Sequence, residues 1–198
     1  MTSANSRTSD SAIDPLFLER WSPRAFTGEA MPEADLMCIL EAARWAPSSY
    51  NSQPWRFLYA RRDTPQWDAF LALLIPFNQS WAKQAGALVI IVSSTTMMPP
   101  GADKPVPSYS HSFDTGAAWA QMALQATRSG WAAHGMVGFD MPRATEELKI
   151  PEGFRVEAAV ALGRMGDKSL LPEAMAAREA PSGRKPLAEL AFEGGFPG

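Results

Sequence analysis

The chain has 198 residues, of which 46% are hydrophobic and 20% charged, so it can bury a substantial core as one α/β domain. Its net charge is −3 and no run of Lys or Arg occurs, which argues against a nucleic-acid-binding surface. Cys38 is the only cysteine, which excludes an intrachain disulfide and a multi-cysteine metal site. No stretch approaches about 18 consecutive apolar residues, so no membrane contact is expected.

The first dozen residues are small and polar and lack the apolar segment of a signal peptide. We therefore expect a cytoplasmic protein. Residues 1–12 are predicted to form a flexible N-terminus, and residues 13–198 a single domain that ends in an extended tail.

The helices and strands can be predicted in chain order from hydrophobic spacing and from turn residues. A helix is expected to end near Arg20. The next is predicted for residues 32–45, because Pro32 suits a first helical turn, apolar residues recur at helical spacing from Leu36, and Pro47 follows. Further along, the pattern predicts a loop at 46–54, a strand at 55–60, helices at 64–74 and 79–84, a strand at 87–92, a long proline-rich loop at 95–111, a helix at 113–129, an extended segment at 131–139, a helix at 142–149, a strand at 156–162 and a tail of little regular structure from 167 onward.

These elements indicate an α+β fold in which helices pack on a four- or five-stranded sheet. The continuous apolar run ALVIIV at 87–92 predicts a strand that is buried on both faces. Cys38 lies beside Leu36 and Ile39 and is expected to pack in the core without a redox role.

The motif search excludes several classes of site. The sequence has no G-x-G-x-x-G, P-loop, H-E-x-x-H or G-x-S-x-G pattern, which argues against a Rossmann nucleotide site, a phosphate loop, a zinc protease site and a hydrolase nucleophile. His111 and His134 have no second ligand at metal-binding spacing, so no metal is expected and both histidines are interpreted as structural.

Three separated segments carry residues suited to binding an anion and a planar ring. Arg20, Ser22 and Arg24 offer guanidinium forks and a hydroxyl suited to phosphate. Residues 46–55 place six hydrogen-bonding side chains between two prolines, as a desolvated heterocycle with a polyol arm would require. A basic pair, Arg184–Lys185, lies in the tail. The alternatives are a solvated basic turn, a Ser/Asn-rich surface loop and an exposed charge pair.

Together these segments resemble the nitroreductase family, from about Pro15 to Phe192. The resemblance rests on R-x-S-x-R-x-F at 20–26, A-P-S-x-x-N-x-Q-P-W at 46–55, Asn78-Gln79 ahead of the apolar strand, G-x-x-G-F at 135–139 and R-K-P-L-x-E at 184–189. It implies a three-layer sandwich with a central, mostly antiparallel sheet flanked by helices. It also implies an intertwined homodimer with FMN between the two subunits.

The resemblance assigns roles to residues of this chain. Arg20, Ser22, Arg24, Arg184 and Lys185 should hold the FMN phosphate and ribityl arm. Some relatives carry a lysine where this chain has Ser182, so the phosphate is expected to rely more on Arg24 and Lys185. The remaining cofactor residues implied are Pro47, Ser48, Ser49 and Asn51 from the partner subunit, Asn78 at the pyrimidine edge of the ring, and Val137 and Gly138 near flavin N5.

The same resemblance implies a chemistry that belongs to the flavin, with no catalytic side chain. NADH or NADPH would pass a hydride to flavin N5, and a nitroaromatic, a quinone or a similar small planar acceptor would then take it in a ping-pong cycle. Tyr50 and Tyr109 are the candidate contacts for the acceptor, with Met97 and Met98 as further parts of an adaptable lid. The alternative for the 95–111 loop is a partly disordered surface segment.

Three other functions stay open at this point. One is a specialised family member that removes a halogen, dehydrogenates a substrate or fragments flavin. Another is a storage or regulatory module that binds flavin without turnover. The last discounts the resemblance and leaves an α/β domain of unknown role.

Overall fold

The computed structural model describes residues 6–197 of the chain. Its centre is a four-stranded sheet in the order β1-β2-β6-β5, and every neighbouring pair is antiparallel. The strands are β1 (Trp55–Arg61), β2 (Ala87–Ser94), β5 (Ala132–Met136) and β6 (Phe154–Gly163).

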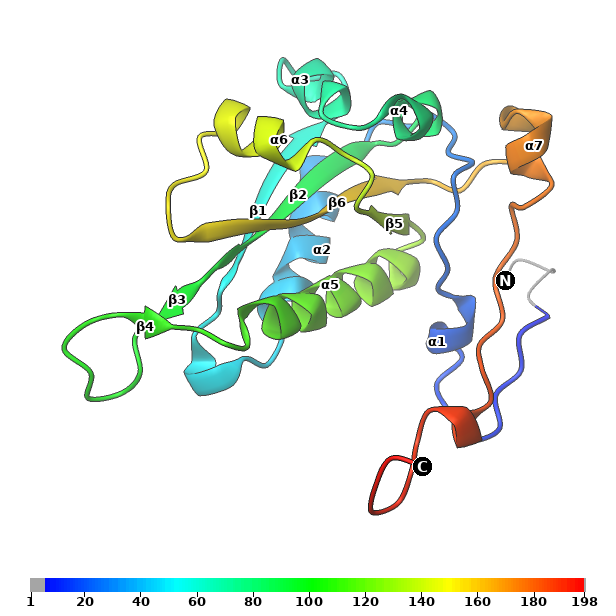
Figure 1. Ribbon diagram of the computed structural model, residues 1–198. Helices are drawn as coiled ribbons and strands as arrows, with labels where there is room; N and C mark the ends of the chain where they lie inside the picture. Colours follow the sequence, from blue (N-terminus) through cyan, green and yellow to red (C-terminus); the bar gives the residue numbers. More distant parts are fainter. Residues whose placement is uncertain (1–5, 198) are drawn as a thin grey trace.

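Helices cover both faces of this sheet (Figure 1). Two long helices, α2 (Glu33–Arg44) and α5 (His111–Arg128), pack on one face. Three shorter helices, α3 (Trp67–Ala72), α4 (Pro76–Ala82) and α6 (Met141–Glu147), cover the other. The remaining elements are α1 (Leu16–Glu19), α7 (Glu173–Ala176) and the 3-10 turns η1 (Ser49–Asn51), η2 (Lys168–Leu170) and η3 (Leu187–Glu189). The predicted α+β three-layer sandwich is confirmed.

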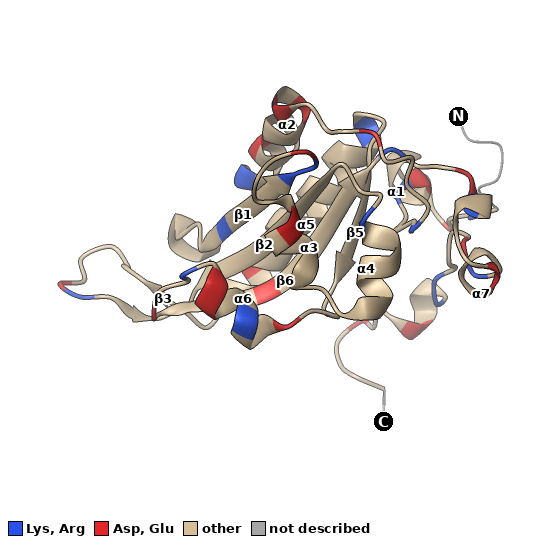
Figure 2. Ribbon diagram, turned by 90° about the horizontal axis from the view of Figure 1, so that it is seen from above, with Lys and Arg blue, Asp and Glu red and all other residues tan. Residues whose placement is uncertain are grey.

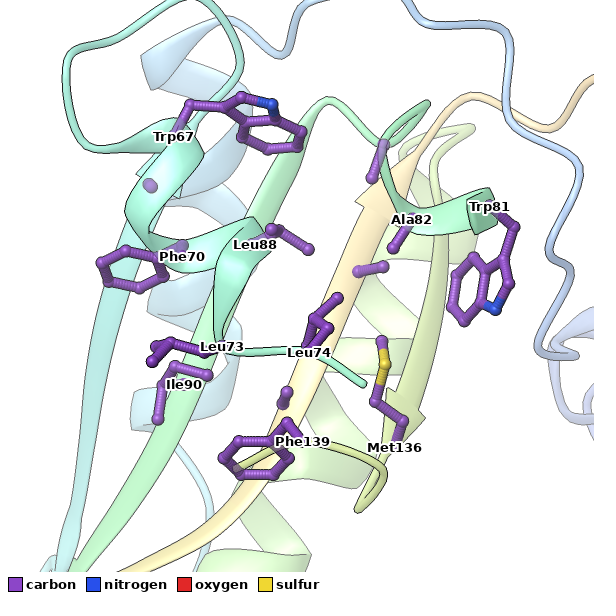
Figure 3. Close-up of a cluster of buried hydrophobic side chains, with 14 of the residues drawn as sticks. Trp67, Phe70, Leu73, Leu74, Trp81, Ala82, Leu88, Ile90, Met136 and Phe139 are labelled. Atoms are coloured by element: carbon purple, nitrogen blue, oxygen red, sulfur yellow. The ribbon is translucent and has the colours of Figure 1, made fainter. Parts of the chain in front are cut away.

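Strand β2 shows why its sequence is apolar throughout. Side chains alternate between the faces of a strand, and Leu88 and Ile90 enter the core beneath α3 and α4, whereas Val89 and Ile91 enter the core beneath α2 and α5. All four are at most 2% exposed. Figure 3 shows the first of these cores, in which Trp67, Phe70, Leu73, Leu74 and Phe139 close over the sheet.

Several predicted boundaries were wrong, for local reasons. Helix α4 begins at Pro76, three residues before the predicted start, because this proline occupies the first helical turn. Helix α3 begins at Trp67, three residues after the predicted start, because Asp63 has a left-handed φ of 65° and a turn follows it. The 95–111 segment holds a small hairpin, β3 (Thr96–Met97) with β4 (Val106–Pro107), and α5 starts at its end.

The predicted burial of Cys38 was also wrong. The buried residues of α2 are Leu36, Ile39 and Ala43, and Cys38 lies outside that stripe and is exposed. Its sulfur lies 3.6 Å from the side-chain nitrogen of Gln125 on α5.

The two ends of the molecule differ in construction. The β3–β4 hairpin projects from one end, and α1, α7 and the tail gather at the other (Figures 1 and 2). In the tail, residues 182–197 are all exposed. The predicted flexible segment 1–12 falls partly outside the described residues, and the described part, from residue 6, lies against the tail through Arg7. Within residues 6–197 no helix is long and apolar enough to span a bilayer.

Candidate functional site

A cavity of about 720 Å³ opens beside α5 and the end of β5. This volume falls within the range of about 300–1,000 Å³ that is usual for small-molecule sites. Arg20 and Ser22 form its polar side. Its apolar lining comes from Phe17, Trp119, Ala120, Ala123, Leu124, Gly135, Met136, Val137 and Ala158.

The polar side is positioned by the chain that follows α1. Helix α1 ends at Glu19 and the backbone becomes extended at Arg20, whose guanidinium lies 3.4 Å from the Ser22 hydroxyl. Phe26 then anchors the segment, because its ring is 1% exposed and its backbone forms a bridge with Met165. The R-x-S-x-R-x-F pattern therefore combines polar groups with the apolar residue that holds them in place.

Two glycines allow the backbone to pass close to its neighbours at this cavity. A Cβ atom on Gly135 would lie 2.9 Å from the Trp119 ring, and one on Gly138 would lie 2.5 Å from the Asn78 amide nitrogen. Both contacts are too short for any larger residue without movement. The glycines of the G-x-x-G-F segment are thus explained by close packing against α5 and α4.

Arginine side chains from distant parts of the chain gather next to this cavity. The pKa of the Arg20 guanidinium is lowered, mainly by burial and then by the charge of Arg184. The pKa of Arg7 is lowered as well, mainly by burial and then by the charges of Arg184 and Arg20. Among the described residues, neither Arg20 nor Arg184 forms an ion pair with a carboxylate within 4 Å. Such a group of mutually repelling cations favours binding of an anion.

A second cavity, of about 590 Å³, adjoins the first, since Phe17 lines both. It lies between residues 6–13 and the tail, and its basic lining residues are Arg7, Arg184 and Lys185. The structure thus brings together Arg20, Ser22 and Arg184, which the sequence placed in one phosphate site.

The other two cations of the predicted phosphate site are engaged with carboxylates. Arg24 lies 3.9 Å from Glu179, whose side chain is only 3% exposed. Lys185 lies 3.7 Å from Glu189 on the tail surface. Their predicted roles toward the phosphate stay predictions, and in this structure each has a competing acidic partner.

The 46–55 loop is fastened to α5. The buried carboxylate of Asp114 accepts hydrogen bonds from the Ser49 amide, at 3.1 Å, and from the Ser110 hydroxyl, at 2.9 Å. Tyr50, Asn51 and Gln53 have left-handed φ values between 47° and 53°. Side chains other than glycine adopt this region rarely, and it concentrates at binding loops.

This loop does not meet the Arg20 segment within one chain. Neither Pro47, Ser48, Ser49 nor Asn51 is among the residues that line the two cavities described here. In Figure 1 the turn that contains η1, drawn in cyan, lies across the molecule from α1. The side chains of Tyr50 and Tyr109 are exposed, by 68% and 103%, and line neither cavity.

Asn78 connects α4 to the Val137–Gly138 segment. Its amide nitrogen donates to the Gly138 carbonyl at 2.9 Å, and its amide oxygen accepts from the Trp81 indole at 3.3 Å. Val137 is 70% exposed and lines the larger cavity. The contact between Asn78 and a flavin ring stays a prediction, and within this chain Asn78 holds the backbone that borders the cavity.

A sequence model of the Nitroreductase family matches residues 18–164. The chain belongs to the nitroreductase family.

Relatives of known sequence and structure agree with this membership. A crystal structure of an oxidoreductase containing FMN is 52% identical, with a TM-score of 0.94 and full coverage of both chains. A protein from Desulfovibrio desulfuricans, assigned as a nitroreductase and crystallised with FMN, is 28% identical, with a TM-score of 0.68 over 94% of this chain and 100% of that one. An uncharacterised 15.4 kDa protein of Mycolicibacterium smegmatis is 37% identical over 63% of this chain and 80% of its own length. Family and neighbours together support oxidoreductase chemistry.

In this nitroreductase-family chain both histidines bond to protein groups. His134 Nδ1 lies 2.9 Å from the Pro23 carbonyl, and its ring packs against Trp81 with centroids 4.6 Å apart. His111 Nδ1 lies 2.8 Å from the Ser93 hydroxyl. No group of three or more His, Cys, Asp or Glu side chains suited to a metal gathers within the part of the chain that the structure describes.

Sequence reasoning missed three residues of the site. Trp119 lies in an alanine-rich helix, and its place at the cavity, against Gly135, is visible only in the structure. Glu179 fastens the tail by accepting from the Arg24 and Ala25 amides, at 2.5 and 2.8 Å. Arg7 lies in a polar segment with no periodic signal. No motif in the sequence pointed to any of the three.

Proposed function

We propose that this protein is an FMN-dependent oxidoreductase that transfers a hydride from NADH or NADPH to nitroaromatic, quinone or similar electron-poor acceptors in a ping-pong cycle. The observation that carries the proposal is that the like charges of Arg20 and Arg184 lie near each other, beside a cavity lined by Trp119, Gly135 and Val137. The FMN contained in the 52% identical oxidoreductase supports the choice of cofactor.

The residues present fit FMN in charge and in shape. A phosphate needs clustered donors, and Arg20, Ser22 and Arg184 supply guanidinium forks and a hydroxyl. A flat ring needs an apolar wall with polar groups at its edge, and Trp119, Met136 and Val137 line such a wall. The mutual repulsion of the arginines would be relieved by a bound dianion.

Bound FMN would supply the hydride transfer itself. The chain would bind the phosphate through Arg20 and Arg184, hold the ribityl arm near Ser22, and present the Val137–Gly138 backbone to the ring. Asn78 would keep that backbone in place through its bond to the Gly138 carbonyl. Donor and acceptor would use the same cavity in turn, since the sequence has no Rossmann motif for a resident nicotinamide.

We further propose an intertwined homodimer that acts in the cytoplasm. Within one chain the 46–55 loop and the Arg20 segment lie apart (Figure 1), so a partner subunit would have to supply Ser48, Ser49 and Asn51 to the flavin. Exposed aromatic residues near this loop favour such a contact, since Trp45 is 70% exposed and Phe113 is 82% exposed. Tyr50 and Tyr109 would then reach the acceptor from the partner.

The test is an absorbance spectrum of the purified protein before and after anaerobic addition of NADH or NADPH. Bands at roughly 370 and 450 nm, as expected for a bound flavin, should be present and should bleach. Bands that persist with both donors would favour a flavin storage module. No bands after reconstitution with FMN would reject the cofactor and with it the proposed function.

Once bleaching is seen, reoxidation identifies the acceptor class. Nitroaromatics and quinones should restore the 450 nm band, and a halogenated aromatic should not. Restoration only by a halogenated aromatic would favour a family member that removes halogen, and bleaching of the oxidised flavin by a saturated substrate would favour a dehydrogenase.

A further inference from the structure

Arg7 joins the two segments that carry the predicted phosphate-binding arginines. Its Nε donates to the Ser182 carbonyl at 2.8 Å, two residues before Arg184. Its Nη1 donates to the Leu18 carbonyl at 3.1 Å and to the Arg20 carbonyl at 2.8 Å. One guanidinium therefore connects residues that are separated by more than 160 positions in the chain.

These bonds bring a third positive charge to the arginine group. The charges of Arg184 and Arg20 both act on Arg7 strongly enough to lower its pKa, after burial. Arg7 and Arg184 also line the same 590 Å³ cavity. Holding like charges together costs free energy, so the arrangement is stabilised when an anion binds between them.

The other nearby cations are less suited to this role. Arg24 faces the carboxylate of Glu179 at 3.9 Å, and Lys185 faces that of Glu189 at 3.7 Å. The Arg7 side chain, in contrast, reaches both segments at once, through the carbonyls of Ser182, Leu18 and Arg20.

We propose that Arg7 is a positioning residue of the phosphate subsite, which orders Arg20 and Arg184 by bonding to the backbone of both segments. The N-terminal segment that begins at residue 6 thus belongs to the cofactor site. This inference rests on the proposed FMN function and adds a residue to it.

The test compares two ligands that differ only in the phosphate. Dissociation constants of FMN and riboflavin are measured by flavin fluorescence quenching on the flavin-free full-length protein. Replacing Arg7 by alanine should weaken FMN binding about 10- to 100-fold, the range expected when a charge-assisted network is lost. Riboflavin binding should change by less than about twofold, because riboflavin has no phosphate that could interact with the altered arginine group.

Two further variants make the result specific. Arg7→Lys keeps the charge but lacks the planar fork, so it should recover part of the lost FMN affinity. Arg128→Ala removes one positive charge from an exposed position in the last turn of α5 and should leave both ligands unaffected.

The outcomes separate this inference from the proposed function. Wild-type protein that binds neither ligand would reject both. Wild-type protein that binds FMN, together with an Arg7→Ala variant of equal affinity, would overturn the role of Arg7 alone. Equal losses for FMN and riboflavin would also overturn it, because Arg7 would then support the fold of the segment and not the phosphate subsite.

Discussion

Single residues show how this chain combines tight packing with polar groups. His134 is held by the Pro23 carbonyl on one side and by the Trp81 ring on the other. Burial is the main reason why its pKa is lowered, and the charge of Arg24 contributes as well. Because a carbonyl only accepts hydrogen bonds, Nδ1 must carry the proton and the ring can be neutral. Its role is therefore to link the Arg24 segment to the sheet.

This arrangement predicts a dependence of stability on pH. The folded pKa of His134 lies below its ordinary value of about 6.5, so the unfolded chain takes up a proton first as the pH falls. The contribution of His134 to stability is present above about pH 6.5 and is lost as the pH falls toward the folded pKa.

Thermal unfolding followed by circular dichroism at pH 7.5 and pH 5.5 checks this prediction. The midpoint of the wild-type protein should fall more between the two values than that of His134→Asn, since asparagine can donate to Pro23 without titrating. Equal falls in both proteins would mean that another group sets the acid limit.

Gly138 gives a second prediction at this scale. Alanine there would place its Cβ 2.5 Å from the Asn78 amide nitrogen and should lower the free energy of unfolding by about 1–3 kcal/mol, as overpacking does. Urea unfolding measures the loss. Gly195→Ala is the matched control, because nothing lies within 4 Å of the added atom, and its stability should equal that of the wild type.

At the scale of elements, few contacts decide where the tail lies. Helix α7 and the segment after it are fastened by Glu179, which accepts from two amides of the Arg24–Ala25 segment and faces the Arg24 guanidinium. Ser182 lies three residues after Glu179, and its carbonyl accepts a hydrogen bond from Arg7. Since residues 182–197 are exposed, the position of Arg184 depends on these attachments.

Glu179→Ala should therefore release the tail. It removes two amide hydrogen bonds and leaves Arg24 without its carboxylate, and we expect a loss of about 2 kcal/mol once the partial exposure of Arg24 is considered. Trypsin should cut after Arg178 or Arg184 faster than in the wild type. The control is Glu173→Ala in the exposed first turn of α7. Unchanged cleavage in the Glu179 variant would show that other contacts hold the tail.

On the scale of the whole molecule, the residues that we propose for the flavin site lie in two distant places. The arginine group lies with α1 and the tail, and the 46–55 loop lies beyond the start of α5 (Figure 1). Exposed aromatic side chains occur at Trp45, directly before the loop, and at Tyr109 and Phe113, close in sequence to Asp114, which bonds to the loop. A two-fold dimer would bring the loop of one subunit to the arginines of the other, and would cover this apolar surface.

The dimer predicts a change of mass when the surface is altered. Wild-type protein should elute in size-exclusion chromatography with light scattering at twice the 21.5 kDa chain mass. Phe113→Glu places a charge in the proposed contact and should shift the protein toward the monomer, with loss of bound flavin. Leu170→Glu, at a residue that is 60% exposed on η2, should stay dimeric. A monomeric wild type would reject the shared site.

The order of helices and strands follows from local properties of the sequence. The ALVIIV run, the stripe on α2 and the prolines beside turns reflect hydrophobic spacing and backbone sterics, which act over a few residues. The motifs around Arg20 and Asn51 were recognisable for the same reason, since each is a short contiguous pattern. Boundaries failed where a local turn competed, as at Asp63, and the exposure of Cys38 was misjudged because two neighbours on its helix are buried.

What only the tertiary structure decided is which distant groups meet. The sequence by itself determined the α+β class, the family resemblance and most cofactor candidates. It could not place Arg7 at Ser182, Glu179 at the Arg24 amides or Trp119 against Gly135. It also did not show that Arg24 and Lys185 have carboxylate partners. These contacts join segments that only the packing of helices on the sheet brings together. The sequence around a charged or aromatic residue does not show which distant residue it will contact.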